Sequence, residues 1–165
     1  MSPISAALLA MTLSFAAMVA AAAWYLVPWL KVTDRATGLT ALLWVHAFRY
    51  VALQIFSAQQ FGFAVSDTGR DQIAIGDVIA ALLAFGAIAA LRYWVRLQVP
   101  ILWMFVLVAA ADLLHSTFVG MREQLFASAS GVTWLILTFY VPLLWISLAL
   151  VVWRLWRHPA KSDAP

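Results

Sequence analysis

The sequence predicts an all-α integral membrane protein, a bundle of five transmembrane helices with its N-terminus outside and its C-terminus in the cytoplasm. The first observation is composition: 65% of the residues are hydrophobic and 10% are charged. Soluble domains have about 45–50% apolar and about 25% charged residues. The second is five apolar runs of the roughly 20-residue length that crosses a bilayer. The third is an uneven distribution of basic residues between alternate loops.

The apolar runs define one domain, residues 1–157, followed by a short cytoplasmic tail, residues 158–165. The five expected spans are residues 4–30, 39–57, 73–91, 100–119 and 132–153. The first run is uncharged, is preceded by no basic residue and is too long for a signal peptide, so we expect a retained helix. Pro100 suits the first turn of the fourth helix. Pro142 should kink the fifth, because it frees the carbonyl of Thr138.

Basic residues give the orientation. Seven of the ten lie on one side of the predicted membrane: Lys31, Arg35, Arg92, Arg96, Arg154, Arg157 and Lys161. Only Arg70 and Arg122 lie on the other, and the tenth, Arg49, lies within a span. The side with more positive charge is cytoplasmic. We therefore expect a multi-pass protein of the inner (plasma) membrane, in contact with the lipid bilayer.

Several classes of function are excluded. The sequence pI is about 9.7, but the basic residues stand singly or in pairs at the ends of apolar runs, so we expect no nucleic-acid binding. The chain has no cysteine, which excludes disulfides, thiolate metal sites and cysteine nucleophiles. A retinal Schiff base needs a lysine within a span, whereas Lys31 and Lys161 both lie outside. Ser116 beside His115 is too generic a pair to predict an enzyme.

Polar residues share one face of the second helix. At about 100° per residue, His46, Arg49, Tyr50, Gln54 and Ser57 fall within an arc of roughly 140°. Lipid cannot solvate such a face, so it should point into the bundle, a water-filled cavity or a partner subunit.

Two other helices carry ionisable residues. On the fourth helix, Asp112, His115 and Ser116 also share one face. On the third helix, Asp77 lies about 6 Å below the outer surface. At 1.5 Å per residue, Arg49 lies about 15 Å from the cytoplasmic surface and Asp112 about 20 Å. Because Arg49 cannot readily lose its proton, we expect it to pair with Asp112 first and with Asp77 second.

These depths predict a polar site in the outer half of the bilayer, built from His46, Arg49, Tyr50, Gln54, Asp77, Asp112 and His115. The leading hypothesis is transport or binding of a small solute, ion or proton. A buried ion pair that only fixes helix register is the structural alternative.

Two further functions stay open. A haem- or metal-binding redox protein would use His46 and His115 for haem b, or Asp112 and His115 for a divalent metal. The depths of the two histidines differ by about 13 Å, which disfavours bis-histidine haem. A non-catalytic subunit of a larger membrane complex would have its polar face covered by a partner. The small residues Gly76, Ala80 and Ala84, spaced four apart on the third helix, allow close packing and suggest an interface of a homo-oligomer.

Overall fold

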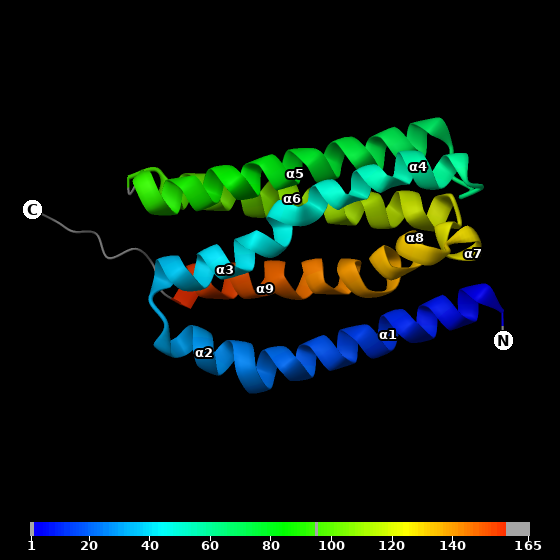
Figure 1. The fold of residues 1–165 in the computed structure, drawn as a ribbon. Helices are drawn as coiled ribbons and strands as arrows, with labels where there is room; N and C mark the ends of the chain where they lie inside the picture. Colours follow the sequence, from blue (N-terminus) through cyan, green and yellow to red (C-terminus); the bar gives the residue numbers. More distant parts are fainter. Residues whose placement is uncertain (1, 95, 158–165) are drawn as a thin grey trace, which may run out of the picture.

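The computed structural model describes residues 2–94 and 96–157, and within these ranges the chain is helical with no β-strand. Five helices are long and apolar enough to cross a membrane: Pro3–Val32, Arg35–Gln60, Asp67–Tyr93, Gln98–Arg122 and Gly131–Arg157. They lie side by side along one axis (Figure 1). The N-terminus lies at the end that carries α7 (Leu125–Ser128), here called the α7 end. The opposite end carries α2 (Val27–Val32) and is called the α2 end.

Three of the long helices contain an irregular turn. The first consists of α1 (Pro3–Ala21), a π-helical turn η1 (Ala22–Leu26) and α2. The second consists of α3 (Arg35–Ala47), a 3-10 segment η2 (Phe48–Leu53) and α4 (Gln54–Gln60). The fifth consists of α8 (Gly131–Leu135), a π-helical turn η3 (Ile136–Tyr140) and α9 (Val141–Arg157). The helices α5 (Asp67–Tyr93) and α6 (Gln98–Arg122) are regular.

Both π-helical turns come directly before a proline. Pro28 follows η1 by two residues, and Pro142 follows η3 by two residues. A proline ring cannot donate a hydrogen bond and clashes with the preceding turn, and a π-helical turn widens the helix where this happens. The irregularity expected from Pro142 is therefore present, with Thr138 inside the π-helical turn.

The helices are longer than the apolar runs in the sequence. The third begins at Asp67 rather than near residue 73, because the polar stretch before the apolar run is already helical. Ser66 caps it by accepting a hydrogen bond from the amide of Gly69 at 3.0 Å, which replaces one of the bonds that the first turn lacks.

The core lies mainly between α3, α5, α6 and α9; the first long helix adds Ala22 and Leu30 to it, whereas its segment α1 lies at the edge of the bundle. Figure 1 shows α1 on the far side of α9 from α5, and its only buried residue is Ala7. The surface of α5 and α6 keeps large apolar side chains exposed, among them Leu82, Leu107 and Leu114. A contiguous apolar surface of this kind is unfavourable in water.

The row of small residues on α5 packs within the chain. Ala80 and Ala84 are fully buried, and Gly76 lies against Asp112 of α6. The close approach expected from the spacing is thus used by this chain's own helices. The homo-oligomer interface expected on the third helix stays a prediction.

Candidate functional site

Arg49 is the centre of the candidate site, although it lies in the 3-10 segment η2. A 3-10 turn inside a long helix changes the direction of the residues that follow and breaks the regular hydrogen-bond ladder. The carbonyl of Val45, in the last turn of α3, accepts a hydrogen bond from the hydroxyl of Tyr140 at 2.7 Å. This bond ties the fifth long helix to the second one turn before Arg49.

Arg49 bridges two carboxylates from two different helices. Its side chain is 1% exposed, and its Nε donates to Asp77 Oδ1 of α5 at 2.6 Å. Its Nη2 donates to Asp112 Oδ2 of α6. The pairing expected from membrane depth is confirmed for both acids. If both carboxylates are ionised, the three side chains sum to one net negative charge that Arg49 alone does not balance.

Gly76 makes room for this arrangement. A Cβ atom at position 76 would overlap Oδ1 of Asp112 and lie 2.8 Å from its Cγ. The absence of a side chain therefore lets the carboxylate of α6 lie directly against the backbone of α5 and still reach Arg49.

A partly enclosed cavity of about 480 Å³ opens on one side of this cluster, in the half of the bundle toward the α7 end. Arg49 and Asp77 line it, and most of its other walls are apolar side chains from α1, α4, α6, α7 and η3. Asp77 keeps 13% of its side chain exposed, and its Oδ2 accepts no hydrogen bond from the described residues. By contrast, Arg49 Nη1 is enclosed and has no partner there. The charge that faces the cavity is therefore the Asp77 carboxylate.

A more open groove of about 660 Å³ lies on the other side, between α5 and α6. Asp112 and His115 line it, together with Asp71 and Gln72 from the start of α5. His115 is exposed and shares this groove with Asp112. Arg49 thus joins a carboxylate that borders the cavity to a carboxylate that borders the groove.

His46 is fully buried, three residues from Arg49 toward the α2 end. Its Nε2 lies 2.9 Å from the hydroxyl of Ser147 on α9. Its ring meets Phe105 edge-on, with centroids 5.1 Å apart. The side chains of Leu43 and Val151, also fully buried, belong to the apolar core of this half of the bundle. The cavity therefore does not continue toward the α2 end.

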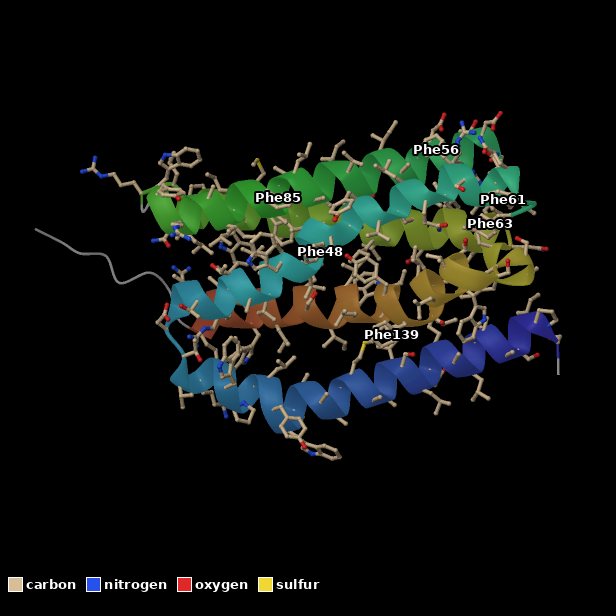
Figure 2. The ribbon with its side chains drawn as sticks, viewed as in Figure 1. Phe48, Phe56, Phe61, Phe63, Phe85 and Phe139 are labelled. Carbon is tan, nitrogen blue, oxygen red and sulfur yellow. The ribbon has the colours of Figure 1, made fainter. Side chains whose placement is uncertain are left out.

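The structure brings Gln54 near the site and leaves Tyr50 away from it. The amide of Gln54 donates to the hydroxyl of Thr133 at 3.3 Å and not to either acid, although Gln54 lines the cavity. Tyr50 is 47% exposed and packs near Phe48, whose position on the second helix is labelled in Figure 2. The angle of about 100° per residue does not hold in the 3-10 segment, which advances by about 120°, so Arg49 and Tyr50 lie about 120° apart around the helix axis.

A family model described as "Domain of unknown function (DUF8737)" matches residues 6–156. The chain belongs to this family. No curated protein matches the chain, and no solved structure matches it. The matched range includes all of the site residues described above, so the site lies within the family's domain.

Charged residues at the α7 end of the domain pair with one another. Arg70 contacts Asp67 at 2.9 Å and Asp71 at 2.7 Å, and its guanidinium lies 4.7 Å from the ring centre of Phe56. Figure 2 shows Phe56 at this end, together with Phe61 and Phe63. The two carboxylates therefore balance the positive charge of Arg70.

Glu123 joins the end of α6 to the start of α5. Its carboxylate accepts hydrogen bonds from the amide of Ser66 at 3.1 Å and from the hydroxyl of Ser66 at 2.9 Å. Together with the guanidinium of Arg122, these bonds hold the pKa of Glu123 below its usual value. Glu123 and Ser66 thus tie two helix ends together.

The metal and haem hypotheses gain no support. No group of three or more His, Cys, Asp or Glu side chains in the described part of the chain is placed to hold a metal ion. His46 is enclosed in the core and bonded to Ser147, while His115 lies on the groove between α5 and α6. The two histidines expected for haem therefore face different surroundings.

Three residues that contact the site could not be predicted from the hydropathy of the sequence. Ser147, Thr133 and Tyr140 come from the fifth long helix, whose expected span contains no acidic or basic residue. Their spacing at about 100° per residue is the one signal in the sequence that could have indicated them.

Proposed function

We propose that this chain is a multi-pass protein of the inner (plasma) membrane that binds, and moves, a small molecule from the outer half of the bilayer. The α7 end lies outside, and the α2 end lies in the cytoplasm. Five long apolar helices and an apolar outer surface support insertion in a membrane, and the seven-to-two division of basic residues supports this orientation. The function rests on one observation: an apolar cavity of about 480 Å³ bordered by the free oxygen of Asp77.

The chemistry of the cavity defines the ligand. Pockets that bind small molecules are mainly apolar with a few polar groups that orient the ligand, as here. The cluster of Arg49, Asp77 and Asp112 has one unbalanced negative charge, and such a charge is costly inside a membrane. The ligand is therefore a hydrophobic monocation, whose charge lies beside Asp77. A proton on either carboxylate balances Arg49 equally well and competes for the same place.

Asp77→Asn should weaken the binding of a hydrophobic cation without unfolding the protein. The variant leaves Arg49 and Asp112 as a neutral pair, so it removes the unbalanced charge. Unit charges about 6 Å apart at an effective dielectric constant of about 20 interact by about 3 kcal/mol, so we expect affinity to fall by more than about tenfold. Equilibrium dialysis of tetraphenylphosphonium against the purified protein measures this, with triphenylphosphine oxide as a neutral comparison.

Asp67→Asn is the matched control, since Asp67 lies on the same helix and is 80% exposed. It should bind tetraphenylphosphonium as the wild type does. Triphenylphosphine oxide should bind the wild type and Asp77→Asn equally. If the wild type shows no saturable binding of the cation, or if Asp77→Asn binds it as well, the proposed ligand class is wrong.

The groove between α5 and α6 supports a second candidate function, assembly with a second copy or a partner subunit. Asp112 and His115 border this groove on the outside of the bundle, where lipid could not solvate the exposed imidazole of His115. A covering chain would shield them.

Because the chain has no cysteine, a single introduced cysteine tests this assembly directly. Ala111→Cys places a thiol on an exposed position of the groove. In native membranes it should form a disulfide dimer, or a crosslink to a partner, under mild oxidation. Leu13→Cys, exposed on α1, should stay monomeric on a non-reducing gel. Equal crosslinking of both variants, or of neither, would count against assembly through the groove.

A further inference from the structure

Arg154 is a buried arginine far from the site described above. It lies near the end of α9 at the α2 end, and it is 2% exposed. Its Nη2 donates to the backbone carbonyl of Thr33 at 2.5 Å. Its Nε and Nη1 are enclosed and have no hydrogen-bond partner among the described residues. An arginine at the end of a membrane helix normally extends its charge to the interface, and this one does not.

A second arginine adds to the positive charge. Arg35, in the first turn of α3, also has an enclosed Nε without a partner in the described chain, and the charges of Arg35 and Arg154 are close enough to repel each other. Neither arginine forms an ion pair with an acid of the described residues. The nearest acid in the sequence, Asp34, is exposed, and its Oδ1 accepts the amide of Thr37 at 2.9 Å.

Arg154 lies next to Gly38 of α3. A Cβ atom at position 38 would lie 3.7 Å from Arg154 Nε and 2.9 Å from the tip of Leu30. The guanidinium therefore lies against the bare backbone of α3, between the second and fifth long helices. Burial of an unpaired charge costs several kcal/mol, and each unsatisfied buried group calls for a missing partner.

We propose that Arg154 and Arg35 hold a phosphate group. An anion of two or more oxygens would accept hydrogen bonds from both guanidinium groups, which match phosphate geometry, and would neutralise the two like charges. Arg35 begins the second long helix and Arg154 lies three residues before the end of the fifth, so the site lies at the level of the lipid headgroups. Basic sites between helices on the cytoplasmic side bind the headgroups of anionic lipids. The phosphate comes from such a lipid or from a soluble phosphate compound.

Lipid dependence of thermal stability tests the site and separates the two sources. The full chain is placed in nanodiscs of phosphatidylcholine, with or without phosphatidylglycerol, and its melting is followed by tryptophan fluorescence. Phosphatidylglycerol should raise the Tm of the wild type. Inorganic phosphate in pure phosphatidylcholine discs should raise it only if the site accepts soluble phosphate.

Arg154→Gln should lose this gain in Tm, and Arg157→Gln should keep it, because Arg157 is exposed on the same helix. Loss of a charge-assisted contact predicts about tenfold less phosphatidylglycerol retained per protein in native mass spectrometry. Arg35→Gln, also expected to reduce retention, covers the case in which Arg154→Gln does not fold.

Three results would overturn the proposal. The first is a wild type whose Tm responds neither to phosphatidylglycerol nor to phosphate. The second is equal retention of phosphatidylglycerol by the wild type, Arg154→Gln and Arg35→Gln. The third is a fall in Tm on Asp163→Asn that is the same with and without phosphatidylglycerol. This result would mean that a carboxylate of the tail, not a phosphate, is the counter-ion of Arg154. Asp163 lies outside the described residues.

Discussion

Replacing Arg49 by alanine should destabilise the protein more than any other single change in the bundle. The substitution leaves Asp77 and Asp112 facing each other across the space of the lost guanidinium. Breaking a buried ion pair by removing one partner costs about 3–5 kcal/mol, and the total stability of a protein is about 5–15 kcal/mol. We expect Arg49→Ala to be recovered from membranes in much lower yield and to melt at a clearly lower temperature.

Arg122→Ala is the control for that result. Arg122 pairs with Glu123 at 2.9 Å and is half exposed, and exposed pairs of this kind contribute about 0–1 kcal/mol. Its yield and Tm should stay close to those of the wild type. Equal, mild effects of Arg49→Ala and Arg122→Ala would show that the cluster is not a buried charge network.

A triple variant separates the charge network from the packing of its side chains. Arg49→Met combined with Asp77→Asn and Asp112→Asn removes every charge of the cluster and keeps its side chains at similar size. Replacement of a whole buried ion network by uncharged groups is often neutral or stabilising. The triple variant should therefore fold better than Arg49→Ala and should bind tetraphenylphosphonium poorly. If the yield and Tm of the triple variant are no higher than those of Arg49→Ala, the shape of Arg49, not its charge, holds the helices together.

The pairing of Arg49 could be predicted from the sequence because it depends on few facts. Hydropathy gives the spans, the basic loops give their direction, and the rise of a helix gives depth. An arginine that cannot lose its proton then has to find the acids at its own depth. Since these steps do not need the packing of individual side chains, Asp77 and Asp112 were both found.

Details that depend on tertiary packing could not be predicted in this way. The 3-10 segment at Phe48–Leu53 contains no proline or glycine from which it could have been predicted. Neither the exposure of Tyr50 nor the bond from Tyr140 to the Val45 carbonyl follows from the sequence pattern. The partner of His46 is Ser147, 101 residues later in the chain, and serine is too common to stand out. In the sequence, Arg154 resembles any basic residue that flanks a membrane helix on the cytoplasmic side. Only its burial in the structure distinguishes it from Arg157.

The role of Gly76 could be predicted only in part. Its spacing with Ala80 and Ala84 indicated helix packing, which the structure bears out for the two alanines. The spacing contained no sign that a carboxylate, rather than an apolar side chain, would occupy the space left by the glycine. One residue therefore links the packing of α5 on α6 to the charge network.

Gly76→Ala should disrupt the cluster, although glycine to alanine usually stabilises a helix. The added Cβ would overlap the Asp112 carboxylate, which would have to rotate away or push α6 from α5. Either movement separates Asp112 from Arg49 and leaves a buried carboxylate without its partner. We expect a loss of about 3 kcal/mol or more, measured as a fall in Tm in nanodiscs.

Gly86→Ala is the matched control on the same helix. No atom lies within 4 Å of the Cβ that alanine would add there, so the variant should gain about 0.5–1 kcal/mol from better helix propensity. The opposite signs of the two glycine substitutions on one helix isolate the carboxylate contact from helix propensity.

Gly76→Ala combined with Asp112→Ala removes the overlap and leaves Arg49 paired with Asp77 as a neutral unit. Its Tm should exceed that of Gly76→Ala alone, since residues in contact couple non-additively. If the two single losses simply add, the contact between Gly76 and Asp112 does not exist in the membrane.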